Sequence, residues 1–268
     1  MKVAFCREKN TIVTGYNGYI GSSFLKNGKL GWVEAPLESI TQPCTILHLA
    51  ANANTNSDDV KLLANNILCD LEVIELAKKY GHRIIYTSTN NVYKKQLGCI
   101  VTDSILPLEQ YGLSKYLGEK LLSSLPSSQY IILRLADVFG SGQKHGNFFK
   151  AIEREMLGLG YFNFLNRGDK LRSYIYINEL ISLFDYVMDV DSFDGNIYNI
   201  CHKTSYSLLD IYCTIIGPPT SYVASELESC YDYRTMEQSD FFGYKYNFDL
   251  KDALLHYSRD VKSRERYE

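Results

Sequence analysis

The sequence predicts an α/β protein with a doubly wound, parallel central sheet. Three observations support this prediction: short strands alternate with helical stretches, the strands are apolar throughout, and a glycine-rich turn follows the first clear strand. Strands covered by helices on both faces are almost uniformly apolar, whereas half-exposed strands alternate apolar and polar residues. The alternation of strands and helices therefore favours a parallel sheet with helices on both faces.

The expected elements follow one another closely in the first half of the chain. Each strand is a short apolar run, and each helix ends at a glycine or just before a proline. The longest helix also carries apolar residues largely at helical spacing. Strands are expected at 11–14, 30–34, 44–50, 83–89 and 130–135, and helices up to about residue 25, over 58–80 and over 111–124.

The second half of the chain has a different pattern. Beyond Gly140, aromatic residues are frequent, and the strands and helices become short. A chain of 268 residues also exceeds the usual size of a single core. We therefore expect a large domain over residues 1–140 and a smaller α/β lobe over 141–268. No linker or repeat separates them, so they are expected to interleave in one compact unit.

Composition excludes several classes of protein. The formal net charge is −3, so there is no basic surplus for general nucleic-acid binding. No apolar run approaches the ~20 residues of a membrane span, and no secretory signal is visible at the N-terminus. The seven cysteines are scattered, without a C-x-x-C pair or a close histidine that would indicate a zinc site. We expect buried, unpaired thiols, no metal site and a cytoplasmic protein.

The glycine-rich turn is a candidate phosphate-binding site. Gly15, Gly18 and Gly21 follow the first clear strand and precede a helix. Glycines allow a tight turn and a close backbone approach, so a pyrophosphate can lie against the amides at the helix N-terminus. The spacing is G-x-x-G-x-x-G rather than the more common G-x-G-x-x-G, and a purely structural turn is the alternative.

An acidic residue about 20 positions beyond such a turn binds the cofactor ribose in NAD-binding proteins. Glu34 lies 34 − 15 = 19 residues after Gly15, and no lysine or arginine accompanies it in the local sequence. The sequence thus favours NAD over NADP. A solvated carboxylate at the end of a strand is the alternative for Glu34.

Tyr111 and Lys115 form a candidate acid–base pair. They are four residues apart at the start of an expected helix, so they share one face of it. A neighbouring ammonium group lowers the pKa of a tyrosine, which makes its hydroxyl usable in proton transfer nearer neutral pH. The spacing is common by chance, and a surface contact is the alternative. The hydroxyl-rich stretch at 86–93 favours a site, because ligands bind at the carboxyl ends of parallel strands.

Together these motifs resemble the extended short-chain dehydrogenases/reductases, often labelled NAD-dependent epimerase/dehydratase, over nearly the whole chain. The matching residues are Gly15, Gly18 and Gly21; Leu49, Ala50 and Ala51; Asn66; Thr89 with Val92 and Tyr93; Pro107, Tyr111, Lys115 and Glu119; Leu133 and Arg134; Val138, Phe139 and Gly140; and Arg172 before Tyr174.

The resemblance implies a Rossmann-type fold that binds NAD or NADP in the large domain and substrate in the smaller lobe. Tyr111 would exchange a proton with a sugar hydroxyl or ketone while the nicotinamide carries the hydride. Thr89 would hydrogen-bond the same oxygen, and Lys115 would hold the nicotinamide ribose. The expected cofactor-binding residues are Gly15, Asn17, Gly18, Tyr19, Ile20, Gly21, Glu34, Leu49, Ala50, Ala51, Asn66 and Lys115.

The implied substrate is a nucleotide-diphosphate sugar. Arg172 resembles the family's phosphate-binding arginine, and Arg234 is either a second phosphate contact or a surface arginine. Asp137 stands where many epimerases have a substrate-contacting asparagine. The expected substrate-binding residues are Asn90, Asn91, Asp137, Asn147, Phe148, Arg172 and Arg234.

Two departures from the sequence pattern of the family reduce the number of reactions to be considered. The 4,6-dehydratases have Thr-Asp-Glu where this chain has Thr89, Asn90 and Asn91, and an amide cannot replace a carboxylate in proton transfer. The 49 − 21 = 28 residues between Gly21 and Leu49 are few for the family, so either a strand is absent or the adenosine side of the site is trimmed.

These features favour a 4-keto-(6-deoxy)sugar reductase. A 4-epimerase and a cofactor-binding regulatory protein without activity are the alternatives. The resemblance also implies a homodimer that packs through the helices at 58–80 and 111–124.

Overall fold

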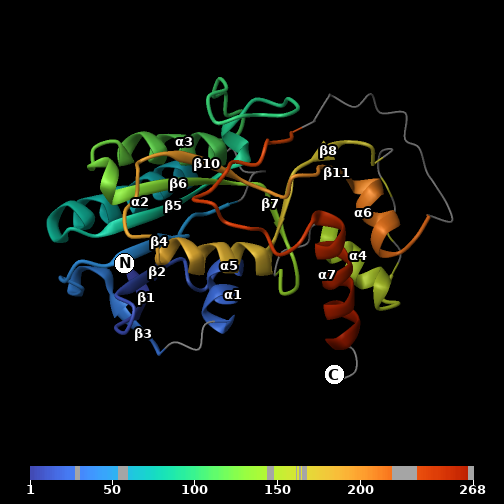
Figure 1. Ribbon diagram of the computed structural model, residues 1–268, viewed down its shortest axis with the longest axis horizontal. Coiled ribbons are helices and arrows are strands. Elements are labelled where there is room, and N and C mark those ends of the chain that lie inside the picture. The colour runs from blue at the N-terminus through green and yellow to red at the C-terminus, as the bar shows by residue number, and fades with distance from the viewer. Residues whose placement is uncertain are drawn as a thin grey trace.

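The computed structural model describes residues 1–27, 31–53, 60–143, 148–160, 162, 164, 168–218 and 234–264. At its centre is a seven-stranded sheet with the strand order β10-β6-β5-β4-β2-β1-β3 (Figure 1). Five neighbouring strands of the sheet run parallel. They are β2 (Thr11–Thr14), β4 (Thr45–His48), β5 (Arg83–Thr89), β6 (Tyr130–Leu135) and β10 (Ile197–Ile200).

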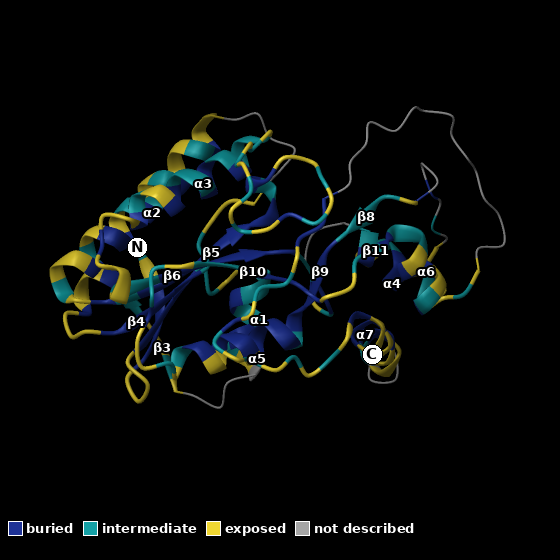
Figure 2. Ribbon diagram, turned by 45° about the horizontal axis from the view of Figure 1, so that its top comes forward, coloured by how far each residue is buried: buried dark blue, intermediate teal, exposed yellow. Residues whose placement is uncertain are grey.

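Helices cover both faces of this sheet. Helices α2 (Val60–Tyr80) and α3 (Gln110–Leu122) lie on one face, and α1 (Tyr19–Asn27) and α5 (Ile177–Met188) lie on the other (Figure 1). Figure 2 shows that the five parallel strands are mostly buried and that α2 and α3 carry their exposed residues on their outer sides. The predicted doubly wound, Rossmann-type fold is confirmed.

The edge of the sheet beyond β2 departs from the expected arrangement. The second strand predicted at 30–34 exists as β3 (Trp32–Pro36), but β1 (Lys2–Cys6) lies between it and β2. Strand β1 runs antiparallel to both neighbours. It forms a hairpin with β2, because only four residues connect the two strands. The N-terminal segment thus fills the position left by the short stretch between Gly21 and Leu49.

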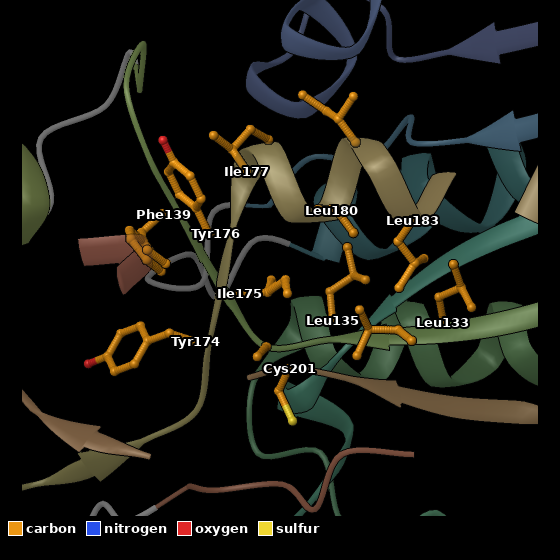
Figure 3. Close-up of a cluster of buried hydrophobic side chains, with 14 of the residues drawn as sticks. Leu133, Leu135, Phe139, Tyr174, Ile175, Tyr176, Ile177, Leu180, Leu183 and Cys201 are labelled. Atoms are coloured by element: carbon orange, nitrogen blue, oxygen red, sulfur yellow. The ribbon is translucent and has the colours of Figure 1, made fainter. Parts of the chain in front are cut away.

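The core on the α5 face is built from β6, α5 and the strand before α5, β9 (Tyr174–Tyr176). Leu133 and Leu135 point from β6 toward Leu180 and Leu183 of α5 (Figure 3). All four side chains are at most 6% exposed, and full burial of a leucine contributes about 1.5–3 kcal/mol to stability. This packing fixes α5 against the sheet.

The residues after β6 build a second group of elements at the carboxyl end of the sheet. Strand β7 (Asp137–Phe139) pairs with β9 (Tyr174–Tyr176), and β8 (Leu171–Arg172) pairs with β11 (Tyr206–Ser207). Helices α4 (Phe148–Met156), α6 (Leu208–Ile215) and α7 (Leu250–Arg264) surround these pairs (Figure 1). Because α5 and β10 return to the main sheet, the division at residue 140 stays a prediction.

Aromatic packing explains why aromatic residues are frequent in this second group. The ring of Phe139 stacks on that of Phe149, with centroids 4.9 Å apart and an interplanar angle of 12°. Tyr174 and Tyr257 meet the edge of the same pair. Short strands and helices are held together here by ring contacts rather than by a long sheet.

The six cysteines among the described residues are free thiols, as expected, but not all are buried. Cys213 is exposed and Cys69 is partly buried, whereas Cys6, Cys44, Cys99 and Cys201 are buried. Across the described ranges, no helix combines the length and the apolar character that a membrane span needs.

Gly118 provides a test of how tightly α3 packs on the sheet. A Cβ at this position would lie 2.0 Å from the Tyr86 hydroxyl and 2.2 Å from Asp70 Oδ2. Alanine gains about 1 kcal/mol over glycine in a helix, but we expect overpacking against two buried groups to outweigh it. Gly118→Ala should lower the free energy of unfolding by about 1–2 kcal/mol in urea titration.

The matched control is Gly31→Ala, where an added Cβ meets nothing within 4 Å. It should change the stability by no more than about 0.5 kcal/mol. Equal effects of the two substitutions would contradict the packing described for Gly118.

Candidate active site

The glycine-rich turn joins β2 to α1 at the carboxyl edge of the sheet. Gly15 has φ +64°, and a Cβ there would lie 2.7 Å from the backbone nitrogen of Ala50. At Gly21 a Cβ would lie 2.5 Å from the carbonyl oxygen of Gly15. These two positions therefore require glycine, because the turn, α1 and the segment after β4 approach one another through their backbones.

The turn also meets the electrostatic requirement for an anion. Asn17 and Gly18 precede α1, which begins at Tyr19 and Ile20, and no acidic residue lies in its first turn. The positive end of the helix dipole favours a phosphate group at this turn. The residues present thus fit the pyrophosphate of a dinucleotide.

Side chains from neighbouring strands and helices hold the segment Leu49 to Ala51. The Oγ1 of Thr14 accepts hydrogen bonds from the backbone nitrogens of Leu49 and Ala50, each at 3.1 Å. Asn66, predicted as a cofactor contact, uses its amide group within the protein instead. It accepts from Asn52 N at 2.8 Å and donates to Ser114 Oγ at 3.0 Å. Its direct contact with a cofactor stays a prediction.

Glu34 lies near the glycine-rich turn, although β1 separates its strand from β2. Its carboxylate accepts a hydrogen bond from the hydroxyl of Tyr16, and Lys2 Nζ lies 2.6 Å from Oε1. The expectation that no cation accompanies Glu34 is therefore wrong. The antiparallel β1 brings Lys2 beside it from 32 residues away in the chain.

Thr89 ends β5 and begins a short 3₁₀ turn, η2 (Asn90–Val92). Its Oγ1 accepts a hydrogen bond from Asn91 N at 3.2 Å and lies 3.4 Å from Asn90 Oδ1, to which it donates. The threonine side chain is 7% exposed. The hydroxyl is thus fixed at the carboxyl edge of the sheet, where the sequence predicted the catalytic threonine.

Helix α3 brings Tyr111 and Lys115 to the same edge. At Gly112, a Cβ would lie 2.4 Å from the carbonyl oxygen of Asn91, so the first turn of α3 packs directly on η2. Lys115 Nζ lies 3.9 Å from the ring centroid of Tyr86, and its side chain is 2% exposed. The alternative of a surface contact between Tyr111 and Lys115 is therefore wrong.

A buried ion pair anchors α3 to the sheet below these residues. Arg134 donates from Nε and Nη2 to the two carboxylate oxygens of Glu119, at 2.9 and 2.7 Å. Ser88 Oγ donates to the same carboxylate at 2.6 Å. Because Ser88 precedes Thr89 on β5, this pair fixes α3 relative to the threonine.

The expectation that the pKa of Tyr111 is lowered is wrong, because it is raised. Burial, and then the negative charge of Asp70, raise the pKa of Tyr111 to about 12. Burial also lowers the pKa of Lys115, against the opposing attraction of Asp70, Cys69 and Glu119. The prediction from the sequence rested on the charge of Lys115 alone, because neither the burial of Tyr111 nor the effect of the Asp70 charge is visible in the local sequence. Tyr111 is thus protonated at neutral pH.

Five predicted substrate-binding residues meet at and beyond η2. Asp137 accepts hydrogen bonds from Asn90 Nδ2 and Arg172 Nη1, both at 3.3 Å. Arg234 donates to Asn91 Oδ1 and lies 3.7 Å from Glu109, which sequence reasoning did not identify. A backbone bridge places Arg172 and Arg234 side by side.

The two arginines differ in exposure. Arg234 is 7% exposed, so the alternative of a surface arginine is wrong, and its Nε has no hydrogen-bond partner among the described residues. Arg172 is partly exposed. Two adjacent guanidinium groups, one buried, suit a phosphate-bearing ligand.

The two remaining candidates are Asn147 and Phe148. Phe148 begins α4 and packs its ring against Phe149 and Phe162, with centroid distances of 5.6 and 5.1 Å. It belongs to the aromatic packing of this part of the chain, and a contact with substrate stays a prediction. Asn147 lies outside the described residues.

The sequence matches the NAD dependent epimerase/dehydratase family over residues 30–201. The chain belongs to this family. The expected family is thereby confirmed. The expected use of NAD or NADP agrees with similar solved structures that hold NAD or NADPH.

Curated relatives of the family align with much of the chain. It is 29% identical over 192 residues to the dTDP-D-glucose 4,6-dehydratase of Dictyostelium discoideum, which covers 64% of this chain and 44% of the relative. It is 25% identical over 238 residues to UDP-glucuronic acid decarboxylase 6 of Arabidopsis thaliana, covering 78% of this chain and 66% of the relative. The chain thus spans less than two thirds of the length of both relatives.

Solved structures of the family share the fold. The UDP-N-acetylglucosamine 4-epimerase of Methanobrevibacter ruminantium M1, in complex with UDP-N-acetylmuramic acid, superposes with a TM-score of 0.78 at 19% identity. That alignment covers 96% of this chain and 99% of the other. RMD from Pseudomonas aeruginosa, complexed with NADPH, gives a TM-score of 0.75 at 20% identity over 94% and 98% of the two chains.

The cluster of Lys2, Tyr16 and Glu34 predicts how the enzyme distinguishes its two possible cofactors. A free ribose suits the Glu34 carboxylate, whereas a 2′-phosphate suits the Lys2 ammonium. Lys2 is 74% exposed, so its contribution is modest. Lys2→Ala should weaken NADPH binding relative to NADH by about five-fold in a fluorescence titration.

Lys78→Ala is the matched control, because Lys78 is also exposed and pairs with an acid, Glu75, on the outside of α2. It should leave the ratio of the two dissociation constants unchanged. An unaltered ratio in Lys2→Ala would show that β1 takes no part in cofactor selection.

Proposed function

We propose that this chain is a reductase of a nucleotide-linked keto sugar. The observation that carries the proposal is the arrangement at the carboxyl edge of the sheet, where the first turn of α3, with Tyr111, packs on η2 beside Thr89, and amides stand at Asn90 and Asn91. Reduction of a ketone requires a proton donor at the carbonyl oxygen, and a neutral tyrosine is such a donor. Oxidation of a sugar hydroxyl would instead require a base at the same position.

The residues of the chain divide the work at the keto oxygen. Bound NADH or NADPH supplies the hydride. Tyr111 donates the proton to the oxygen, and the Thr89 hydroxyl, fixed by Asn91 N, hydrogen-bonds the same oxygen. Lys115 lies one turn after Tyr111 on α3, with its Nζ 3.9 Å from the ring centroid of Tyr86, and its positive charge would stabilise the phenolate that proton donation leaves.

Arg172 and Arg234 support a substrate with a diphosphate. Their neighbouring backbones bring two guanidinium groups to the edge beyond η2, and a guanidinium matches phosphate oxygens with two parallel hydrogen bonds. Asp137 holds Arg172 at 3.3 Å in the free protein. A diphosphate would compete with this carboxylate for Arg172.

Water elimination is not part of the proposal. Asn90 donates to Asp137, and Asn91 accepts from Arg234, so both amides already have partners in the protein. Neither amide can take up or release a proton at neutral pH. The carboxylate pair that a sugar dehydratase of this family has at these positions is absent from the sequence.

A 4-epimerase is the second candidate, and the relatives favour it. The chain is 23% identical to a putative UDP-glucose 4-epimerase of Methanocaldococcus jannaschii over 82% of its length, and an epimerase is among the similar structures. An epimerase uses the same residues twice and regenerates its cofactor. Net consumption of NADH or NADPH with a 4-keto sugar nucleotide supports the reductase, whereas isomer formation without net consumption supports the epimerase.

Tyr111→Phe tests the proton donor. Loss of the hydroxyl should lower turnover by about 10²–10⁴-fold, while cofactor binding should stay nearly unchanged because the ring remains. Stopped-flow absorbance of the reduced cofactor and fluorescence titration measure the two effects.

Tyr116→Phe is the control on the same helix, where the tyrosine ring contacts Lys120 instead. It should keep both turnover and cofactor binding. Full turnover in Tyr111→Phe would refute the proposed mechanism.

We also propose a homodimer that packs through α2 and α3. Leu68 on α2 is 63% exposed, and a second copy packed on α2 would cover it. Sedimentation at micromolar concentration should give twice the mass of the chain, and Leu68→Glu should shift it toward the monomer.

Leu159 is also 63% exposed but follows α4, away from these helices. Leu159→Glu should therefore leave the sedimenting mass unchanged. A monomer mass for the unsubstituted protein would exclude the dimer.

A further inference from the structure

A continuous chain of buried polar groups lies behind the catalytic edge. The Oγ1 of Thr14 lies 2.7 Å from His48 Nδ1, His48 Nε2 lies 2.8 Å from Asp70 Oδ1, and Asp70 Oδ2 accepts from the Tyr86 hydroxyl at 2.8 Å. The side chains of Thr14, His48, Asp70 and Tyr86 are at most 1% exposed. The proposed reaction assigns no role to this chain of groups.

Valence fixes the direction of each hydrogen bond. Thr14 Oγ1 accepts from the amides of Leu49 and Ala50, so both of its lone pairs are used and its proton goes to His48 Nδ1. His48 therefore carries its own proton on Nε2 and donates it to Asp70. Since His48 and Tyr86 are both neutral donors, the charge of Asp70 is not neutralised by its hydrogen-bond partners.

The chain of groups ends beneath Lys115. The Tyr86 hydroxyl that bonds Asp70 also lies 3.4 Å from the carbonyl oxygen of Lys115, and the Tyr86 ring lies 3.9 Å from Lys115 Nζ. Gly118, one turn further along α3, leaves no space for a Cβ between Tyr86 and Asp70. Helix α3 thus lies directly against the carboxylate.

We propose that Asp70 is a positioning residue that holds Lys115 as a cation and Tyr111 as a proton donor from behind the active site. The same carboxylate reaches the cofactor side through His48 and Thr14, whose hydroxyl holds the amides of Leu49 and Ala50. This inference rests on the proposed function of Tyr111 and Lys115.

The directions of the pKa shifts of Asp70 and Lys115 agree with this geometry. Burial alone would raise the pKa of Asp70, but Lys115 and the hydrogen bonds from His48 and Tyr86 outweigh it and lower the pKa. Asp70 in turn opposes the burial that lowers the pKa of Lys115, together with Cys69 on α2 and Glu119 on α3. Among the charges that act on Lys115 and on Tyr111, that of Asp70 has the largest effect on both pKa values.

Asp70→Asn tests the charge while it keeps the shape. The Asn oxygen can still accept from His48, and the Tyr86 hydroxyl can turn to the carbonyl of Lys115. Loss of the negative charge lowers the pKa of both Lys115 and Tyr111, because each would then gain less from keeping its proton. The basic limb of the pH profile should move to lower pH by roughly one unit.

Two profiles are measured between pH 6 and 10.5: turnover with a 4-keto sugar nucleotide, and the dissociation constant of NADH by fluorescence. The second needs no substrate. If the unsubstituted protein turns over no sugar nucleotide, the proposed function fails, and the binding profile alone decides the role of Asp70. If both profiles keep their basic limb in Asp70→Asn, the inference is overturned.

The control is Glu179→Gln, another carboxylate buried at 0% exposure and fully hydrogen-bonded, to Tyr244, Asn247 and Phe248. It lies on α5, on the other face of the sheet from Lys115. It should lower the melting temperature without moving either pH profile. An equal shift in Glu179→Gln would show that the effect follows lost stability and would overturn the inference.

A double-substitution cycle covers the case in which Asp70→Asn is too unstable to assay. Lys115→Met leaves the Asp70 carboxylate without its cation, so the melting temperature should fall. Addition of Asp70→Asn should then recover part of that fall, because the uncompensated charge disappears. A further fall in the double variant would overturn the coupling between Asp70 and Lys115.

Discussion

The common alignment of the parallel strands is the constraint on which the rest of this structure depends. Strands β2, β4, β5 and β6 run in the same direction, so their carboxyl ends meet at one edge. Residues that are far apart in the sequence, such as Gly15, Leu49 and Thr89, are thereby brought together. Every group argued to bind or react lies at this edge or directly behind it.

Most of the fold could be predicted because each central strand is apolar on both faces. The strands at 11–14, 83–89 and 130–135 have the predicted bounds, and the predicted helices differ by a few residues. The sequence pattern did not reveal β1. Its pairing depends on a four-residue connection and on a free sheet edge, and neither feature leaves a periodic signal in the sequence.

In the candidate site too, pairs of residues that are close in the sequence could be predicted, whereas contacts between residues far apart in the sequence could not. Tyr111 and Lys115 could be paired from helical spacing alone, and Arg172 could be identified from its resemblance to a family. Asp70 could not be found in this way, since nothing in its local sequence indicates that it faces α3. The direction of the tyrosine pKa depends on this residue and on burial, which explains why reasoning from Lys115 alone gave the opposite direction.

The N-terminal hairpin also has a consequence for the order in which the sheet assembles. In the hairpin, Cys6 pairs with Thr11, only five residues away, whereas the parallel partner of Thr11 on β4 is Thr45. Contacts between residues close in sequence form faster than distant ones, because less chain entropy is lost in closing the loop. The strand that leads into the glycine-rich turn can therefore gain its first partner early. During synthesis, β1 and β2 also leave the ribosome before β4, β5, β6 and β10, so this hairpin provides an edge on which the later parallel strands can assemble.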